Sequence, residues 1–232
     1  RTNTSVYDPT TGAQTEINER GPEVSAQEIE LFQDKLLYLA RGADIVVIAG
    51  SLPRGVDPGI YADLIRELRE LGVTTVVDAE GEPMRLAVRA EPDVISPNVL
   101  EAEELVGQEF NDEDDRIAAV TSLCALGARE AIVTLPDGCV ARVLEDGAPA
   151  LRRMWIEPRE AVASRGAGDS FLAGYVAARY SGSTAEDCLR FAVACGAEST
   201  QHLGAGLVDP LSVERLLAEV RPEAPEASAQ VL

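Results

Sequence analysis

The sequence predicts an α/β fold in which helices cover both faces of a mostly parallel sheet. Short, continuous apolar runs recur along the chain, and this pattern is typical of strands that are buried on both faces. Stretches with helical periodicity separate these runs, and such alternation favours a parallel sheet. The length of 232 residues, of which 46% are hydrophobic, is enough for one large domain with a sizeable core.

The first residues are predicted to form a small β element apart from the main sheet. Residues 2–6 and 14–17 have a β-type composition, and the turn-forming segment 8–12 joins them. We expect a hairpin or a pair of lid strands. A helix with a capping box at its start is predicted over residues 25–41. Its apolar stripe comprises Ile29, Phe32, Leu36, Leu39 and Ala40.

From residue 44 onwards, apolar runs alternate with helical patterns. Strands are predicted at residues 44–50, 73–78, 93–96 and 131–135, with an edge meander at 138–144 and 150–156. Further helices are predicted at residues 58–71, 83–89, 98–106, 112–126, 169–180, 184–201 and 209–220. Residues 221–232 are rich in Pro, Ala and Glu and are predicted to be a flexible tail, so the folded domain covers residues 1–220.

Composition excludes several classes of partner and compartment. The net charge of -20 argues against nucleic acid or an anionic membrane, because both require a basic surface. No apolar run approaches the length of a membrane span. The four cysteines show no metal-binding spacing and favour a reducing compartment, so we expect a cytoplasmic protein. The chain starts with Arg1 inside a structured segment, and we therefore expect it to be part of a longer protein.

Polar residues follow the predicted strands at the points where ligands bind in parallel sheets. These residues are Ser51, Asp78, Asn98, Glu101, Asp137 and Gly138. Local structure explains several of them individually: Asn98 is a good N-cap, Glu101 completes a capping pattern, and Gly138 is a turn glycine. Their recurrence on successive strand ends indicates a binding site.

One further segment points to the chemistry of that site. Gly166, Ala167 and Gly168 permit a tight turn, and their N–H groups can converge on an anion where a helix begins. Asp169 follows directly. A carboxylate would repel a phosphate unless its role is to accept a proton beside it, and this combination fits phosphoryl transfer to a hydroxyl. The alternative is that Asp169 is an N-cap and the glycines only end a loop.

These segments resemble the PfkB (ribokinase-type) carbohydrate kinases. Residues 166–171 (GAGDSF) resemble that family's C-terminal signature, residues 50–55 its GSLP-x-G loop, and residues 96–101 its K-P-N-x-x-E segment. Residues 1–3 and 15–22 are similar to the subgroup of 1-phosphofructokinases and tagatose-6-phosphate kinases. The resemblance implies a ribokinase-like three-layer sandwich with part of a small β lid at about residues 1–20, and with the family's N-terminal strands missing.

The same resemblance implies roles for individual residues. Asp169 would be the general base, and Gly166, Ala167 and Gly168 would form the anion hole for the γ-phosphoryl group of ATP. Asn98 and Glu101 would hold the Mg²⁺–phosphate cluster, the glutamate through water. The nucleotide would lie between the helix region at residues 195–206 and the loop that contains Thr134, Leu135, Asp137 and Gly138.

On the substrate side, the resemblance assigns Arg1 to the phosphate already on the sugar, and Ser51 and Asp169 also to substrate binding. It implies a possible homodimer through the lid. Three local departures stand out: Ser96 replaces the lysine of K-P-N, Pro136 shortens a loop, and Arg165 precedes the anion hole.

The resulting prediction is an ATP-dependent kinase of a phosphosugar, with fructose 1-phosphate as acceptor. Tagatose 6-phosphate and fructose 6-phosphate remain alternatives, as does a non-catalytic relative that binds a sugar phosphate or a nucleotide. A dinucleotide-binding dehydrogenase is disfavoured, because Gly166 and Gly168 lack the G-x-G-x-x-G spacing. The chain by itself is expected to be inactive, because part of the sugar site would be absent.

Overall fold

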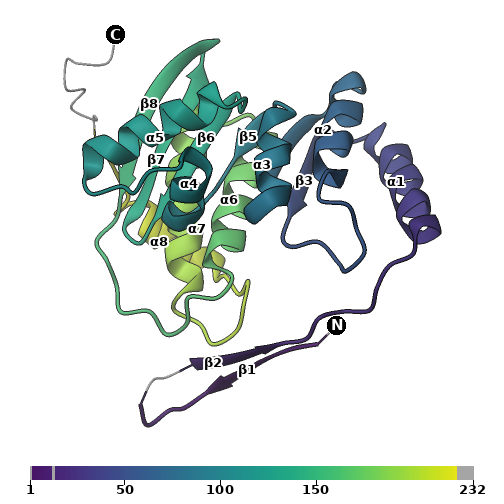
Figure 1. Cartoon of the computed structure of the whole chain (residues 1–232). Coiled ribbons are helices and arrows are strands. Elements are labelled where there is room, and N and C mark those ends of the chain that lie inside the picture. The colour runs from purple at the N-terminus through teal and green to yellow at the C-terminus, as the bar shows by residue number, and fades with distance from the viewer. Residues whose placement is uncertain (1, 12–13, 224–232) are drawn as a thin grey trace.

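The computed structural model describes residues 2–11 and 14–223. Its first element is the predicted hairpin, in which β1 (Asn3–Tyr7) and β2 (Gln14–Asn18) pair antiparallel, with Thr4 opposite Ile17 and Val6 opposite Thr15. The hairpin forms a sheet of its own and lies apart from the body of the molecule (Figure 1).

The body is built on a mixed sheet of seven strands that runs in the order β3-β4-β5-β6-β7-β8-β9. Neighbouring strands are parallel from β3 to β6 and antiparallel from β6 to β9. The strands are β3 (Ile45–Ala49), β4 (Thr74–Asp78), β5 (Val94–Ile95), β6 (Glu130–Leu135), β7 (Gly138–Glu145), β8 (Ala148–Trp155) and β9 (Arg221–Glu223). The predicted α/β class and the predicted meander are both confirmed.

Each predicted helix is present, with its ends shifted by a few residues. The helices are α1 (Ala26–Ala40), α2 (Ile60–Glu70), α3 (Gly81–Arg89), α4 (Val99–Val106), α5 (Glu113–Ala125), α6 (Ala167–Tyr180), α7 (Ala185–Ser199) and α8 (Pro210–Leu217). The predicted capping box is present at the start of α1, where the Ser25 side chain and Glu28 bond each other's backbone N–H groups. No helix in residues 2–11 and 14–223 is long and apolar enough to cross a membrane.

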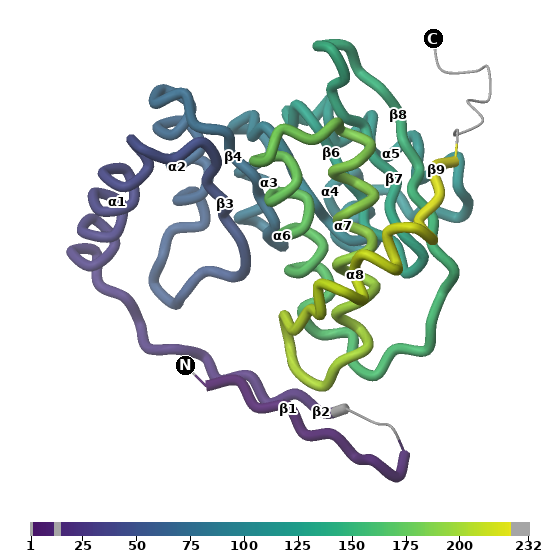
Figure 2. Tube along the Cα trace, turned by 180° about the vertical axis from the view of Figure 1, so that it is seen from behind, coloured from purple at the N-terminus to yellow at the C-terminus, as the bar shows by residue number. Residues whose placement is uncertain are grey.

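Helices cover the sheet in two layers, which makes the body a three-layer sandwich. Val77 of β4 belongs to the apolar cluster that includes side chains from α2, α3 and α5. Val76, the preceding residue, belongs to the opposite cluster, with side chains from α6, α7 and α8. Adjacent strand residues therefore face different helix layers, as in a sheet buried on both sides. Figures 1 and 2 show the two layers from opposite sides.

Two features differ from the sequence-based expectation. Residues 221–223, assigned to the flexible tail, form β9 and pair with β8, with Pro222 opposite Met154; this pairing also covers one end of the meander. The rest of the predicted tail lies outside the described residues. In addition, the apolar stripe of α1 is only partly buried, because Phe32 is 53% and Leu39 60% exposed. The helix lies beyond β3, the last strand on that side of the sheet (Figure 2).

Candidate active site

The carboxyl ends of β4, β5 and β6 meet the start of α6 around a small pocket of about 190 Å³. It is lined by Asp78, Ser96, Asn98, Glu101, Thr134, Gly166, Gly168 and Asp169. Parallel strands bring their carboxyl ends to one edge of a sheet, and this is why residues far apart in the sequence converge here. The structure therefore brings together predicted residues from two of the three motifs, residues 96–101 and 166–171, whereas no residue of the third, residues 50–55, lines this pocket.

Gly166 begins α6 in a conformation that favours glycine. It is the N-cap of the helix, with φ at +79° in the left-handed region. A Cβ atom at this position would lie 2.8 Å from the backbone nitrogen of Gly206 and 3.0 Å from the Cβ of Ala205. The close approach of Ala205 and Gly206 to Gly166 fixes the direction in which the helix starts. The Ala167 N–H donates to the carbonyl of Ser164 at 3.3 Å, so Gly168 and Asp169 supply the next N–H groups of the helix start for an anion.

Asn98 and Glu101 form a capping box at the start of α4 and also line the pocket. The Glu101 carboxylate accepts the Asn98 backbone N–H at 2.9 Å, and the Asn98 side-chain oxygen accepts the Glu101 N–H at 3.0 Å. The structural and functional interpretations of these two residues are therefore compatible. Burial, followed by the charge of the nearby Glu80, raises the pKa of Glu101 against the opposing effect of the Asn98 backbone bond.

Asp78 was predicted to lie at the end of a strand, but no role was predicted for it. Burial, reinforced by the charges of Glu101 and Asp169, raises its pKa to about 7. An acid with such a pKa beside two other carboxylates marks a site that lacks positive charge. The only signal in the sequence was its place directly after an apolar strand.

This concentration of negative charge fits a divalent cation that keeps part of its water shell. Within the described parts of the chain, no three acidic, His or Cys side chains are close enough to hold a metal by themselves. Mg²⁺ is commonly bound through one or two carboxylates together with waters and substrate phosphates. Asp78 and Glu101 suit that role, and the water-mediated assignment of Glu101 remains a prediction.

A second cavity, of about 400 Å³, lies on the side where the nucleotide is expected. Thr134, Leu135 and Gly138, which the resemblance assigns to the nucleotide, line it, and Gly168 connects it with the acidic pocket. Its other walls come from Phe171, Gly196, Ala197 and Thr200, among others. Its size is in the range of small-molecule sites.

Asp137, which was predicted to contact the nucleotide, forms an ion pair with an arginine. Its carboxylate accepts a hydrogen bond from the guanidinium of Arg153 at 2.8 Å. Arg153 is buried, and Asp137 is not among the residues that line the cavity. Asp137 therefore holds the turn between β6 and β7, and its neighbours form the cavity wall.

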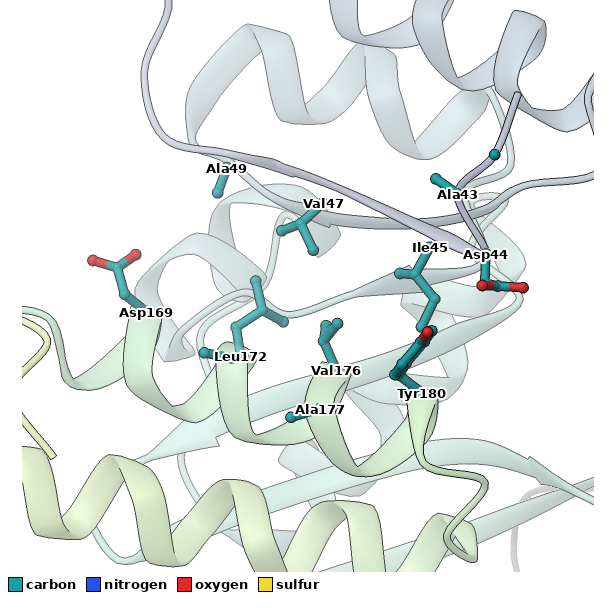
Figure 3. A pocket seen from close by; sticks show the side chains of 12 residues that line it. Ala43, Asp44, Ile45, Val47, Ala49, Asp169, Leu172, Val176, Ala177 and Tyr180 are labelled. Carbon is teal, nitrogen blue, oxygen red and sulfur yellow. The ribbon is translucent and has the colours of Figure 1, made fainter. Parts of the chain in front are cut away.

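A third cavity, of about 630 Å³, runs between the edge strand β3 and α6. Asp169 lies at one end of it and Tyr180 at the other, while Val47 faces Leu172 and Val176 between them (Figure 3). Val47 is 44% exposed, because no strand of the described residues pairs with the outer edge of β3. Asp169 thus faces an apolar groove on one side and the acidic pocket on the other.

The remaining predicted residues lie away from the pocket or outside the described residues. Arg1, assigned to the substrate phosphate, lies outside the described residues. Ser51 is exposed in the loop after β3 and lines none of the three cavities. Arg165, the residue before Gly166, forms an ion pair with Glu16 of β2 and so connects the hairpin to the start of α6.

Comparisons with known proteins agree with this geometry. The family model described as pfkB family carbohydrate kinase matches residues 1–211. A 1-phosphofructokinase of Borreliella burgdorferi is 31% identical over 212 residues, which are 91% of this chain and 67% of that protein. A tagatose-6-phosphate kinase of Staphylococcus epidermidis is 30% identical over 213 residues, or 90% of this chain and 67% of that protein.

Two solved structures show the same similarity at the level of the fold. Phosphofructokinase-2 from Escherichia coli, in complex with substrates and products, superposes with a TM-score of 0.85 at 26% identity, covering 93% of this chain and 69% of that one. Arabidopsis thaliana ribokinase, complexed with ribose and ATP, gives a TM-score of 0.68 at 26% identity, with coverages of 88% and 65%. The chain spans about two thirds of the length of these relatives.

Proposed function

Because the chain belongs to the pfkB family of carbohydrate kinases, we propose that its protein transfers the γ-phosphoryl group of ATP to a hydroxyl of a phosphosugar. The observation that carries this proposal is Asp169 in the first turn of α6, directly after the left-handed Gly166. A proton acceptor and an anion-binding helix start are then adjacent. Phosphoryl transfer requires these two functions together with counter-charge.

In the proposed reaction, Asp169 accepts the proton of the attacking hydroxyl. The N–H groups of Gly168 and Asp169 hold the transferred phosphoryl group, and their dipoles favour its negative charge. Asp78 and Glu101 would hold a hydrated Mg²⁺, which would supply counter-charge to the phosphate groups. The cavity between Thr134 and Thr200 receives the nucleotide.

We propose fructose 1-phosphate as the acceptor. Relatives named 1-phosphofructokinase and relatives named tagatose-6-phosphate kinase match at nearly equal identity, so tagatose 6-phosphate and fructose 6-phosphate remain alternatives. An ADP-release assay with the three phosphosugars at equal concentration tests this choice. We expect the highest kcat/KM for fructose 1-phosphate; a tenfold preference for another sugar would reject it.

The exposed outer edge of β3 determines which forms of the protein this assay should compare. The groove beside Asp169 is apolar and exposed along β3, so water has access to the position of the reacting hydroxyl. We expect little turnover from the 232-residue chain alone, and turnover from a protein of the length of the relatives. Both forms belong in the assay, each with an Asp169→Asn variant as the blank.

A non-catalytic binding protein is the second candidate, and one observation favours it. Ser96, buried in the acidic pocket, stands where the family resemblance expects a lysine, so the pocket lacks that positive charge. Such a protein would bind ATP or a phosphosugar in calorimetry, and neither the short nor the long form would release ADP.

The hairpin and the thiols support two further proposals. Val6 and Ile17 lie on one face of the hairpin and are exposed, and we propose that a second copy covers them in a homodimer. Size-exclusion chromatography of a Val6→Lys variant tests this, since an unchanged elution volume would contradict it.

All four cysteines are free, which fits the reducing cytoplasm.

A further inference from the structure

Glu198, near the end of α7, is a buried carboxylate whose two oxygens bind different parts of the chain. The side chain is 2% exposed. Its Oε1 lies 2.6 Å from Nε2 of His202, and its Oε2 accepts the backbone N–H of Asp209 at 3.1 Å. Burying a carboxylate is costly unless it is fully paired. A negative charge at the C-terminal end of a helix is also unfavourable, so stabilisation of α7 does not explain this residue.

The two partners of Glu198 are the two ends of one loop. His202 precedes residues 203–208, and Asp209 follows them as the N-cap of α8. One carboxylate therefore closes the loop at its base. Between these anchors the loop has little regular structure, and Gly204 and Gly206 both have positive φ. The contacts of Glu198 thus fix the conformation of residues 203–208, which the backbone hydrogen bonds of this segment alone would hold only weakly.

This loop packs against the start of α6. The backbone nitrogen of Gly206 and the Cβ of Ala205 are the atoms that a side chain on Gly166 would meet, at 2.8 and 3.0 Å. The loop is therefore a direct neighbour of the residue that sets the direction of the anion-binding N–H groups. Neither Glu198 nor His202 lines any of the three cavities described above, so both would act through the loop.

We propose that Glu198 and His202 are positioning residues for the anion hole. They hold residues 203–208 against Gly166 and so keep the helix start in the orientation that receives a phosphoryl group. The expected effect on ATP binding rests on the proposed function, whereas the expected effect on the conformation of residues 203–208 does not.

Glu130 provides a matched control, because it is an equally buried carboxylate that is bound in a different place. It is 3% exposed, at the start of β6, and accepts hydrogen bonds from Tyr175 at 2.9 Å and Arg179 at 2.7 Å. Its partners lie in the later turns of α6, away from residues 203–208. Removing Glu130 should therefore lower stability without changing the anion hole.

The experiment compares Glu198→Ala, His202→Ala and Glu130→Ala by three measurements: Tm, amide hydrogen exchange, and calorimetric binding of MgATP. We expect Glu198→Ala and His202→Ala to increase exchange of the Asp209 amide, which donates to Glu198, and to weaken ATP binding about tenfold. Glu130→Ala should lower Tm and leave both other readouts unchanged. Glu198→Gln keeps an acceptor for the Asp209 N–H and should restore most of the affinity. His202 is more than one third exposed, so its variant is expected to fold even if Glu198→Ala does not.

Unchanged exchange of the Asp209 amide in His202→Ala, together with unchanged ATP affinity in that variant, would overturn the inference. Equal losses of ATP affinity in Glu130→Ala and Glu198→Ala would also overturn it, since the role would then be one of general stability. If the unmodified protein does not bind ATP, the proposed function fails, and the exchange measurement still decides whether Glu198 and His202 hold the loop.

Discussion

Asp78, the last residue of β4, and Asp169, in the first turn of α6, line the same small pocket, and the charge of Asp169 helps to raise the pKa of Asp78 to about 7. Burial of Asp78 is the larger cause, and Glu101 adds to it. The site is therefore organised around negative charge that the folded chain does not neutralise by itself. This repulsion is a property of the folded protein, because unfolding separates the three carboxylates.

The first prediction concerns the pH dependence of stability. Between the ordinary pKa of 3.8 and the folded value of about 7, the folded protein holds a proton on Asp78 that the unfolded chain releases. The free energy of unfolding should therefore fall as pH rises from 4 to 8, by at most about 4 kcal/mol from this residue. Urea unfolding at pH 5 and pH 8 measures it. Asp78→Asn should remove most of the fall, whereas the exposed Asp63→Asn should not.

A second prediction concerns Mg²⁺. A cation near Asp78 favours its ionised form, so metal binding should release a proton at pH 6 and be tighter at pH 8. Calorimetry of Mg²⁺ added to the protein without nucleotide, in buffers of different ionisation enthalpy, counts the protons released. In Asp78→Asn the affinity should be lower and this proton release should disappear. Equal affinities at both pH values in the unmodified protein would exclude Asp78 from the metal site.

The third prediction tests Asp169 as general base. In an active form of the protein, Asp169→Asn should lower kcat by about 10²- to 10⁴-fold, because the amide cannot accept the hydroxyl proton. ATP affinity should change little, since the N–H groups of the helix start remain. Asp63→Asn, an acid in the first turn of α2, is the matched control and should keep full activity. Comparable turnover in the Asp169 variant would reject the general-base role.

Much of the fold was predictable because periodicity and caps are local. The apolar run of β4 and the N-cap Asn98 can both be recognised within a few residues of sequence, and both were predicted correctly. The convergence of Asn98 with Gly168 in one pocket was predictable from a general property of parallel sheets. The family resemblance added the expected chemistry of these positions.

Other features depend on long-range contacts and had no local signal. The composition of residues 221–223 favours a tail, and only the free edge of β8 makes them a strand. The raised pKa of Asp78 depends first on its burial and then on the charges of Glu101 and Asp169, which come from other elements. Glu198 lies within an otherwise ordinary helical pattern, and its role is defined only by the loop that folds back onto it.

The last prediction compares two glycines at opposite ends of α6. Gly166 and Gly182 both lie in the left-handed region, with φ at +79° and +77°, so alanine at either position should cost about 1–2 kcal/mol of backbone strain. A Cβ on Gly182 meets nothing within 4 Å, whereas one on Gly166 meets Gly206 and Ala205. Gly182→Ala should therefore lower only the free energy of unfolding.

Gly166→Ala should lower the free energy of unfolding further and should also weaken ATP binding, because residues 203–208 and the start of α6 can no longer pack at their present distance. Urea unfolding and calorimetry on the two variants separate the strain from the contact. Equal stability losses with equal ATP affinities would show that residues 203–208 can move away without cost, and that their packing on Gly166 does not shape the anion hole.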